Sequence, residues 1–250
     1  ASLLKALVVL VVVGAGLSAK VGKLPKSFKK CKKSDPKLNS CLKNAIQLAV
    51  PKLVEGIPSL GLFPIDPLRI QELLINQGSG PISIQLHFKD LDITGLQSAN
   101  ITDVKANWDN YQLDADVLLS NAINLQGNYK INGKVLILPI QGDGRCNLTL
   151  DNLVAKLALK GKELKKEGRI YMDVTNFSVK FTTTRLYLYF ENLFNGDKAL
   201  GDNMNNFLNE NWSEILRELK PAIENALAAA FSEIANRIFH KVPFNDIVPL

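Results

Sequence analysis

Apolar and polar residues alternate with a period of two over the middle of the chain, from about residue 69 to residue 195. The clearest rows cover residues 82–89, 113–119, 125–135, 177–182 and 186–191. This alternation is typical of strands with one buried and one solvated face. Turn-forming residues at 77–80, 132–133, 142–144 and 161–168 separate the rows and predict a long antiparallel meander. Asn132-Gly133 fits either a turn or a bulge inside a strand.

The period changes to 3.6 residues from about 202 to 240, where one broad apolar stripe predicts a long helix. Asp202 or Asn203 is the expected start, and the length would be roughly 55 Å at 1.5 Å per residue. Pro221 lies inside this segment and predicts a kink near Arg217–Pro221.

A shorter helix is predicted near the start, capped by Asn39 or Ser40 and ending near Val54, with Pro51 bending or shortening it. Residues 56–67, rich in Gly and Pro, predict an extended connection.

The two main patterns constrain each other. The sequence has no second long helix to pair with the first, so its apolar stripe must lie on the apolar face of the sheet. The sheet must then curve around the helix along its length. Such a fold leaves either an elongated apolar space or a core filled by side chains.

The first residues have the composition of a secretory signal peptide. Lys5 precedes an uncharged apolar run over 6–13, and small residues follow up to Ala19. Cleavage is expected after Ala19 or Ser18, and an uncleaved membrane anchor is the alternative. We therefore expect a signal peptide at 1–19, a single domain over 20–250, and a secreted, extracellular protein.

Positive charge is concentrated in one segment of this chain of 250 residues. Residues 20–43 contain nine Lys and one Asp, a net charge of +8, whereas residues 44–250 carry −3. A basic arm of this kind either is simply solvated or binds an anionic partner such as lipid. Aromatic residues are not regularly interleaved with these lysines for base stacking, and a secreted protein does not meet nucleic acid, so we expect no nucleic-acid partner.

The cysteines fit an oxidising compartment. Cys31 and Cys41 are close enough in sequence to close a small loop, which leaves Cys146 as a free and buried thiol. Four Asn-X-Ser/Thr triplets make Asn100, Asn147, Asn176 and Asn211 candidate glycosylation sites.

The composition disfavours most catalytic and metal chemistry. The chain has two His and three Cys, too few for a zinc-finger array, and we expect no metal site and no cofactor. His87 falls in a solvent-facing row and His240 at a helix end, so neither is placed as the base of a hydrolase. The pairs Asp90/Asp92 and Asp114/Asp116 fit a solvated strand face better than a glycosidase pair. We expect no enzyme.

Several motifs together resemble the insect Takeout and juvenile-hormone-binding protein family. They include the early cysteine pair, the connection Gly56-Ile-Pro-Ser-Leu-Gly61, the segment Pro64-Ile-Asp-Pro67, the strand from Phe88 to Leu96, the C-terminal helix with Pro221, and the closing Val242-Pro-Phe244. The resemblance covers essentially the whole mature chain.

This resemblance implies an α+β fold, an α/β-wrap in which a strongly curved antiparallel sheet encloses a long C-terminal helix and a hydrophobic tunnel. It also implies a monomeric extracellular carrier of a long hydrophobic ligand, as in hemolymph or chemosensory fluid. Members that bind juvenile hormone itself typically have a second, later disulfide, which Cys146 has no later cysteine to form. The resemblance therefore favours the Takeout branch.

The alternating rows and the helix stripe supply the residues that we expect to bind the ligand. They are Ile84, Leu86, Val117, Leu119, Tyr129, Ile131, Val135, Phe177, Phe181, Leu188, Phe207, Trp212, Leu216 and Phe231. Tyr129 alone adds a hydroxyl, which we expect to meet a ligand head group. The alternative function is a surface-acting protein that binds anionic lipid or membranes through the basic arm, with a transient contact to a membrane or a receptor.

Overall fold

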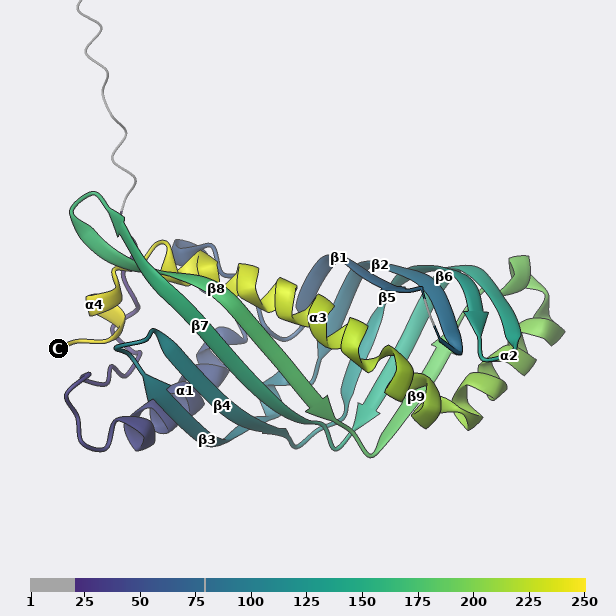
Figure 1. The fold of residues 1–250 in the computed structure, drawn as a ribbon, viewed down its shortest axis with the longest axis horizontal. Coiled ribbons are helices and arrows are strands. Elements are labelled where there is room, and N and C mark those ends of the chain that lie inside the picture. Colours follow the sequence, from purple (N-terminus) through teal and green to yellow (C-terminus); the bar gives the residue numbers. More distant parts are fainter. Residues whose placement is uncertain (1–20, 79) are drawn as a thin grey trace, which may run out of the picture.

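The computed structural model describes residues 21–78 and 80–250. The expected signal peptide, 1–19, lies outside the described residues. Every strand pair in the structure is antiparallel, and a long C-terminal helix crosses between two curved sheets (Figure 1). The predicted α+β wrap is therefore confirmed.

The strands form two sheets rather than the single meander that the sequence predicted. The first sheet has the order β1-β2-β5-β6-β9, and the second has the order β3-β4-β7-β8. The strands of the first sheet are β1 (Leu68–Gln77), β2 (Ile82–Thr94), β5 (Ile123–Val135), β6 (Leu138–Asp151) and β9 (Arg185–Phe190). Those of the second are β3 (Ala99–Asn107), β4 (Gln112–Leu119), β7 (Val154–Lys166) and β8 (Arg169–Thr182). Successive hairpins, β1–β2, β3–β4, β5–β6 and β7–β8, therefore belong alternately to the first and the second sheet, and β9 returns to the first.

Two glycine segments considered as turns lie inside strands, which is the alternative that the sequence left open for Asn132-Gly133 and a correction for 142–144. Gly133 is within β5 at a φ of 144°, and a Cβ there would lie 2.2 Å from the carbonyl oxygen of Ser83 on β2. Gly142 is within β6, where a Cβ would lie 2.5 Å from the Tyr129 hydroxyl. These glycines are required by close packing across the sheet and do not reverse the chain.

The helical half also differs in detail from the prediction. Where one helix was expected from about residue 202, the structure has α2 (Lys198–Glu210) and α3 (Trp212–Phe239). The break lies at Asn211, whose backbone leaves helical geometry with a φ of −105° and a ψ of 17°, while its side-chain amide donates to the carbonyl of Phe207. The helix α3 is continuous through Pro221. Figure 1 shows α2 at the far end of the first sheet, turned away from the axis of α3.

The helices α1 (Leu38–Leu53) and the short α4 (Phe244–Ile247) lie at the other end (Figure 1). Three 3₁₀ turns complete the described fold: η1 (Pro58–Leu60) before β1, η2 (Leu96–Ser98) between β2 and β3, and η3 (Phe194–Gly196) directly before α2. The N-cap of α1 is Lys37 rather than Asn39 or Ser40, and the Asn39 side chain instead accepts a hydrogen bond from the backbone of Ala106 on β3. Within the described residues, no helix is both long and apolar enough to cross a bilayer.

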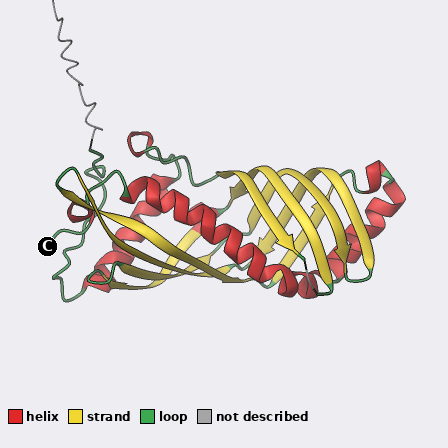
Figure 2. Ribbon diagram, turned by 45° about the horizontal axis from the view of Figure 1, so that its top comes forward, coloured by secondary structure: helices red, strands yellow, loops and turns green. Residues whose placement is uncertain are grey.

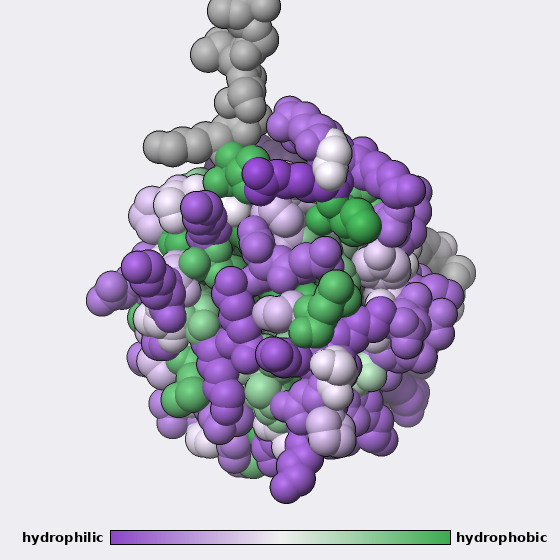
Figure 3. Space-filling view, turned by 90° about the vertical axis from the view of Figure 1, so that its left-hand side faces the viewer, coloured by the Kyte–Doolittle hydropathy of each residue, from purple (hydrophilic) through white to green (hydrophobic). Residues whose placement is uncertain are grey.

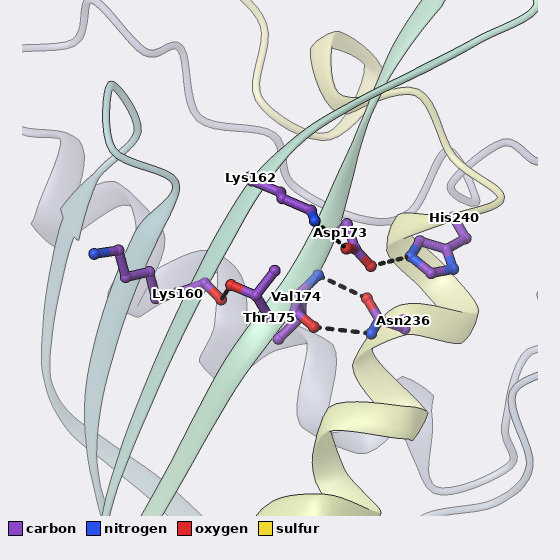
Figure 4. Close-up of polar contacts among 7 residues, drawn as sticks. All are labelled: Lys160, Lys162, Asp173, Val174, Thr175, Asn236 and His240. Carbon is purple, nitrogen blue, oxygen red and sulfur yellow. Dashed lines mark hydrogen bonds and ion pairs between the residues drawn. The ribbon is translucent and has the colours of Figure 1, made fainter.

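Side-chain amides from the helices bond the outer edges of three strands. Asn205 and Asn209 of α2 each donate to and accept from the backbone of one residue of β9. Asn236 of α3 does the same on β8, as Figure 4 shows, and Gln47 of α1 bonds two residues of β3. Each amide thereby occupies the place of a neighbouring strand, which fixes the helices against the sheets.

Candidate functional site

An apolar cavity lies between α3 and the concave faces of both sheets. Its volume is about 410 Å³, within the range of roughly 300–1,000 Å³ for small-molecule sites. All nine strands contribute to its wall, and every lining residue is apolar. The curvature of the strands around α3, visible in Figure 2, encloses this space.

The helix α3 forms one long side of the cavity. Its lining positions follow the three- and four-residue spacing of a single helix face, and they are Ile215, Leu216, Leu219, Ile223, Leu227, Phe231 and Ile234. From the first to the last, this face extends roughly 28 Å at 1.5 Å per residue. The cavity is therefore elongated along the helix.

Most of the residues predicted to bind ligand lie at the cavity. They are Ile84, Leu86, Val117, Leu119, Ile131, Val135, Phe181, Leu188, Leu216 and Phe231. Their side chains come from β2, β4, β5, β8, β9 and α3, so the two periodic patterns of the sequence converge on one space. Contact with a ligand remains a prediction for each of them.

Tyr129 does not line the cavity. Its hydroxyl donates a hydrogen bond to the backbone carbonyl of Glu191 at 2.6 Å, and its ring packs against Phe190 at 4.7 Å between centroids. The side chain is 2% exposed, and burial raises the pKa of the hydroxyl well above its usual value of 10. The predicted role in meeting a head group is therefore not available to this hydroxyl in the structure.

Three further predicted residues lie beside the cavity rather than at it. Phe177 belongs to a second apolar cluster with Met172 and Val174, and its ring lies edge-on to Phe231 at 6.0 Å. Phe207 packs against the main core from α2. Trp212, at the start of α3, lies under the guanidinium of Arg185 at 5.4 Å.

Sequence reasoning missed the parts of the wall that come from β1, β3, β6 and β7, and in β1 and β6 the cause is an interrupted alternation. Leu73 and Ile75 of β1 line the cavity, but Glu72 interrupts the alternation of this strand and shifts its phase. Ile140 of β6 also lines it, in a stretch that the glycines at 142 and 144 made appear to be a turn. In both strands a weak alternation was present on either side of the interruption.

One buried charge lies close to the cavity wall, on the side of α3 that faces β8. The Glu224 side chain is 5% exposed, and its carboxylate accepts hydrogen bonds from the Lys180 ammonium at 2.6 Å and from the Phe181 backbone at 3.3 Å. Both carboxylate oxygens are thus engaged by β8. The pair attaches the middle of the helix to the second sheet.

The cysteines are arranged as predicted. Cys31 and Cys41 form a disulfide, and Cys146 is free and buried on β6. Burial raises the pKa of the Cys146 thiol to about 11, and the thiol lies 3.6 Å from the carbonyl oxygen of Gly127. A thiol in this setting is protonated and unreactive at neutral pH.

The candidate glycosylation sites differ in exposure. Asn100, Asn147 and Asn176 are exposed on β3, β6 and β8. Asn211 is half-buried, and its amide is already bonded to Phe207. Occupancy of the three exposed sites remains a prediction, and Asn211 is the least accessible of the four.

The two histidines lie far apart in the fold. His87 is on β2 with its ring nitrogen 3.9 Å from Glu72, and His240 follows α3 and contacts Asp173 of β8 at 2.9 Å (Figure 4). Across residues 21–78 and 80–250, no group of three His, Cys, Asp or Glu side chains is placed to hold a metal ion.

Comparison with known proteins decides the family. The model of the haemolymph juvenile hormone binding protein family matches residues 6–249. The chain belongs to this family. In the crystal structure of Takeout 1 from Epiphyas postvittana, the family fold superposes with a TM-score of 0.74 at 29% identity, covering 89% of this chain and 100% of that one.

Curated family relatives give the same result. The circadian clock-controlled protein daywake of Drosophila melanogaster is 27% identical over 89% of this chain and 87% of its own. A Schistocerca gregaria protein whose name proposes that it binds β-carotene is 21% identical over 86% of both chains. The juvenile hormone-binding protein of Manduca sexta is 38% identical over a shorter stretch, 26% of this chain and 28% of its own. The family is one of binding proteins for small hydrophobic ligands.

Proposed function

We propose that this protein is a secreted, non-enzymatic carrier that binds one long hydrophobic ligand in the cavity along α3. The observation that carries the proposal is an elongated cavity of about 410 Å³ whose lining residues are all apolar. A fatty acid, a terpenoid or a juvenile-hormone-like ester fits this description. The carrier acts as a monomer and needs no cofactor or metal.

The binding energy in this proposal comes from burial of the ligand chain. Each buried CH₂ group contributes about 0.8 kcal/mol. A chain of about fifteen such groups contributes about 12 kcal/mol, which supports roughly micromolar affinity after a cost of association of about 4 kcal/mol. Because no polar side chain lines the cavity, a buried charge would have no partner there and would be costly. A ligand with an ionised head is therefore expected to keep that head at one end of the cavity.

The test is a titration of homologous fatty acids and primary alcohols, with and without EDTA. Affinity should rise with chain length up to the limit of the cavity and fall beyond it. At equal length the alcohol should bind at least as tightly as the ionised acid, and EDTA should change nothing. Affinity that is independent of chain length, or binding abolished by EDTA, would contradict the proposal.

A further inference from the structure

Positive charge is concentrated at one end of the molecule. The described part of the basic arm, residues 21–43, contains eight Lys and one Asp, a net charge of +7. The turn region of the β7–β8 hairpin, residues 160–169, contains four Lys and one Arg against two Glu, a net charge of +3. The other residues from 44 onward together carry −6. The chain is thus strongly polarised, although its net charge is small.

The arm and the hairpin lie close together. Lys33 of the arm pairs with Asp109 in the β3–β4 turn at 2.6 Å, and Tyr111 of the same turn donates its hydroxyl to Glu163 of the hairpin at 3.3 Å. Figure 1 shows the arm, α1, the hairpin tip and the C-terminus at one end of the molecule. Figure 3 faces this end, and hydrophilic residues cover most of it around separate hydrophobic patches. We call this surface, residues 21–43 and 160–169, the basic end.

The cavity extends toward the basic end. Its wall there includes Val50 of α1, Ile65 of the extended connection and Ile234 of α3. Leu24 and Phe28 of the arm pack in the same apolar cluster as Ile234. The arm therefore packs beside the residues that bound this part of the cavity.

An exposed aromatic ring lies next to this part of the wall. Phe63 precedes Ile65 by two residues and is 65% exposed. The guanidinium of Arg237 lies 5.4 Å from its ring centroid. An exposed aromatic side chain next to a basic group is a combination with which interfacial proteins enter the headgroup region of a bilayer.

We propose that the basic end docks on membranes that contain anionic phospholipid, and that the ligand is exchanged with the bilayer there. Each basic side chain near an anionic surface strengthens binding by a factor of about five, so several together hold the molecule. The other residues from 44 onward carry a net charge of −6 and add no net attraction to such a membrane, so the basic end is the surface expected to face it. The exchange step rests on the proposed carrier function, whereas the docking step does not.

Docking is tested by sedimentation with phosphatidylcholine vesicles, with and without phosphatidylserine. The protein should pellet with the vesicles that contain phosphatidylserine, remain in solution with phosphatidylcholine alone, and be released as salt shortens the Debye length. Equal binding to both kinds of vesicle, or binding to neither, would overturn the docking proposal.

Matched charge reversals test which surface docks. The double variants K29E/K30E in the arm and K165E/K166E in the hairpin should each lower the vesicle partition coefficient at least about tenfold. The control K130E/K134E makes the same change in net charge at exposed positions of β5, and its effect should be less than about threefold. A control as impaired as the other two would show that only net charge matters and would overturn the assignment of the surface. Thermal unfolding of each variant establishes that it is folded.

Membrane docking and ligand exchange can be disproved separately. Transfer of a fluorescent fatty-acid analogue from the protein to vesicles should accelerate with the phosphatidylserine fraction, and K165E/K166E should abolish the acceleration. If the protein binds the analogue but no vesicle, the carrier function stands and docking is wrong. If it binds vesicles but no analogue, docking stands and the carrier function is wrong.

Discussion

The ammonium of Lys180 on β8 lies 2.6 Å from the carboxylate of Glu224, a side chain of α3 that is 5% exposed. The lysine is largely solvated and the glutamate is not. Removing the lysine therefore leaves a buried carboxylate without its cation, which costs more than the loss of an ordinary surface ion pair.

We expect Lys180→Met to lower the free energy of unfolding by about 1–3 kcal/mol, because the Glu224 carboxylate loses a charged donor in a buried position. Lys156→Met is the matched control, since Lys156 lies directly opposite Lys180 on β7 and pairs with the more exposed Asp116. Its effect should stay below about 1 kcal/mol. Urea denaturation measures both, and equal losses would show that the burial of Glu224 has no energetic consequence.

Tyr129→Phe should destabilise the fold without affecting ligand binding. The variant loses the hydrogen bond to the carbonyl of Glu191, worth about 1 kcal/mol, while the contact with Phe190 persists. Affinity for a fluorescent fatty-acid analogue should stay within about twofold of the unmodified protein, since Tyr129 does not line the cavity and its hydroxyl is bonded to the carbonyl of Glu191. A large loss of affinity in a folded variant would return Tyr129 to the ligand site.

Stability should fall at alkaline pH through Cys146. The folded-state pKa of this thiol is raised from 9.0 to about 11, so the native state holds the proton more tightly than the unfolded state does. The resulting stabilisation is complete below about pH 9 and is lost as the pH rises from 9 through 11. The difference in unfolding free energy between the unmodified protein and Cys146→Ala should shrink over that interval. A difference independent of pH would contradict this prediction.

Thiol titration of the denatured, unreduced protein should find a single reactive group, because Cys31 and Cys41 are paired.

Filling the cavity should block ligand binding. Leu86→Trp on β2 and Leu216→Trp on α3 place an indole into the space and should each weaken binding of the fluorescent analogue at least about tenfold. Phe207→Trp is the control, because Phe207 was predicted from the sequence but lies beside the cavity. Thermal unfolding shows whether each variant is folded. A folded Leu86→Trp that binds like the unmodified protein, or a Phe207→Trp that binds as poorly as the cavity variants, would contradict the placement of the site.

The sequence predicted which side is buried in the regularly alternating strands and in the long helix, and the structure bears this out at Ile84, Leu86 and Leu216. It did not predict which buried residues border empty space. Tyr129 and Phe207 follow the same periodicities as the lining residues, yet each meets protein atoms. Periodicity records the side of a strand or helix that faces inward, whereas a cavity depends on how several distant elements pack.

The partition of the strands into two sheets could not be predicted for a related reason. Pairing of β2 with β5, or of β6 with β9, joins segments that are separated by a hairpin of the other sheet. Alternation is identical in both sheets and carries no information about partners. The break at Asn211 was equally hidden, because the apolar stripe continues from α2 into α3 and only the backbone angles of this one residue depart from the helix.

The amides that bond the strand edges also affect how the protein behaves at high concentration. An edge strand with free N–H and C=O groups is a template on which another chain can add a strand, and this is a common start of aggregation. Asn205 and Asn209 occupy those groups on β9, Asn236 on β8, and Gln47 on β3. At these positions an added strand would find the backbone groups already bonded, so each of the three edges offers a shorter template for another chain. The amides therefore lower the tendency of three of the four sheet edges to start aggregation.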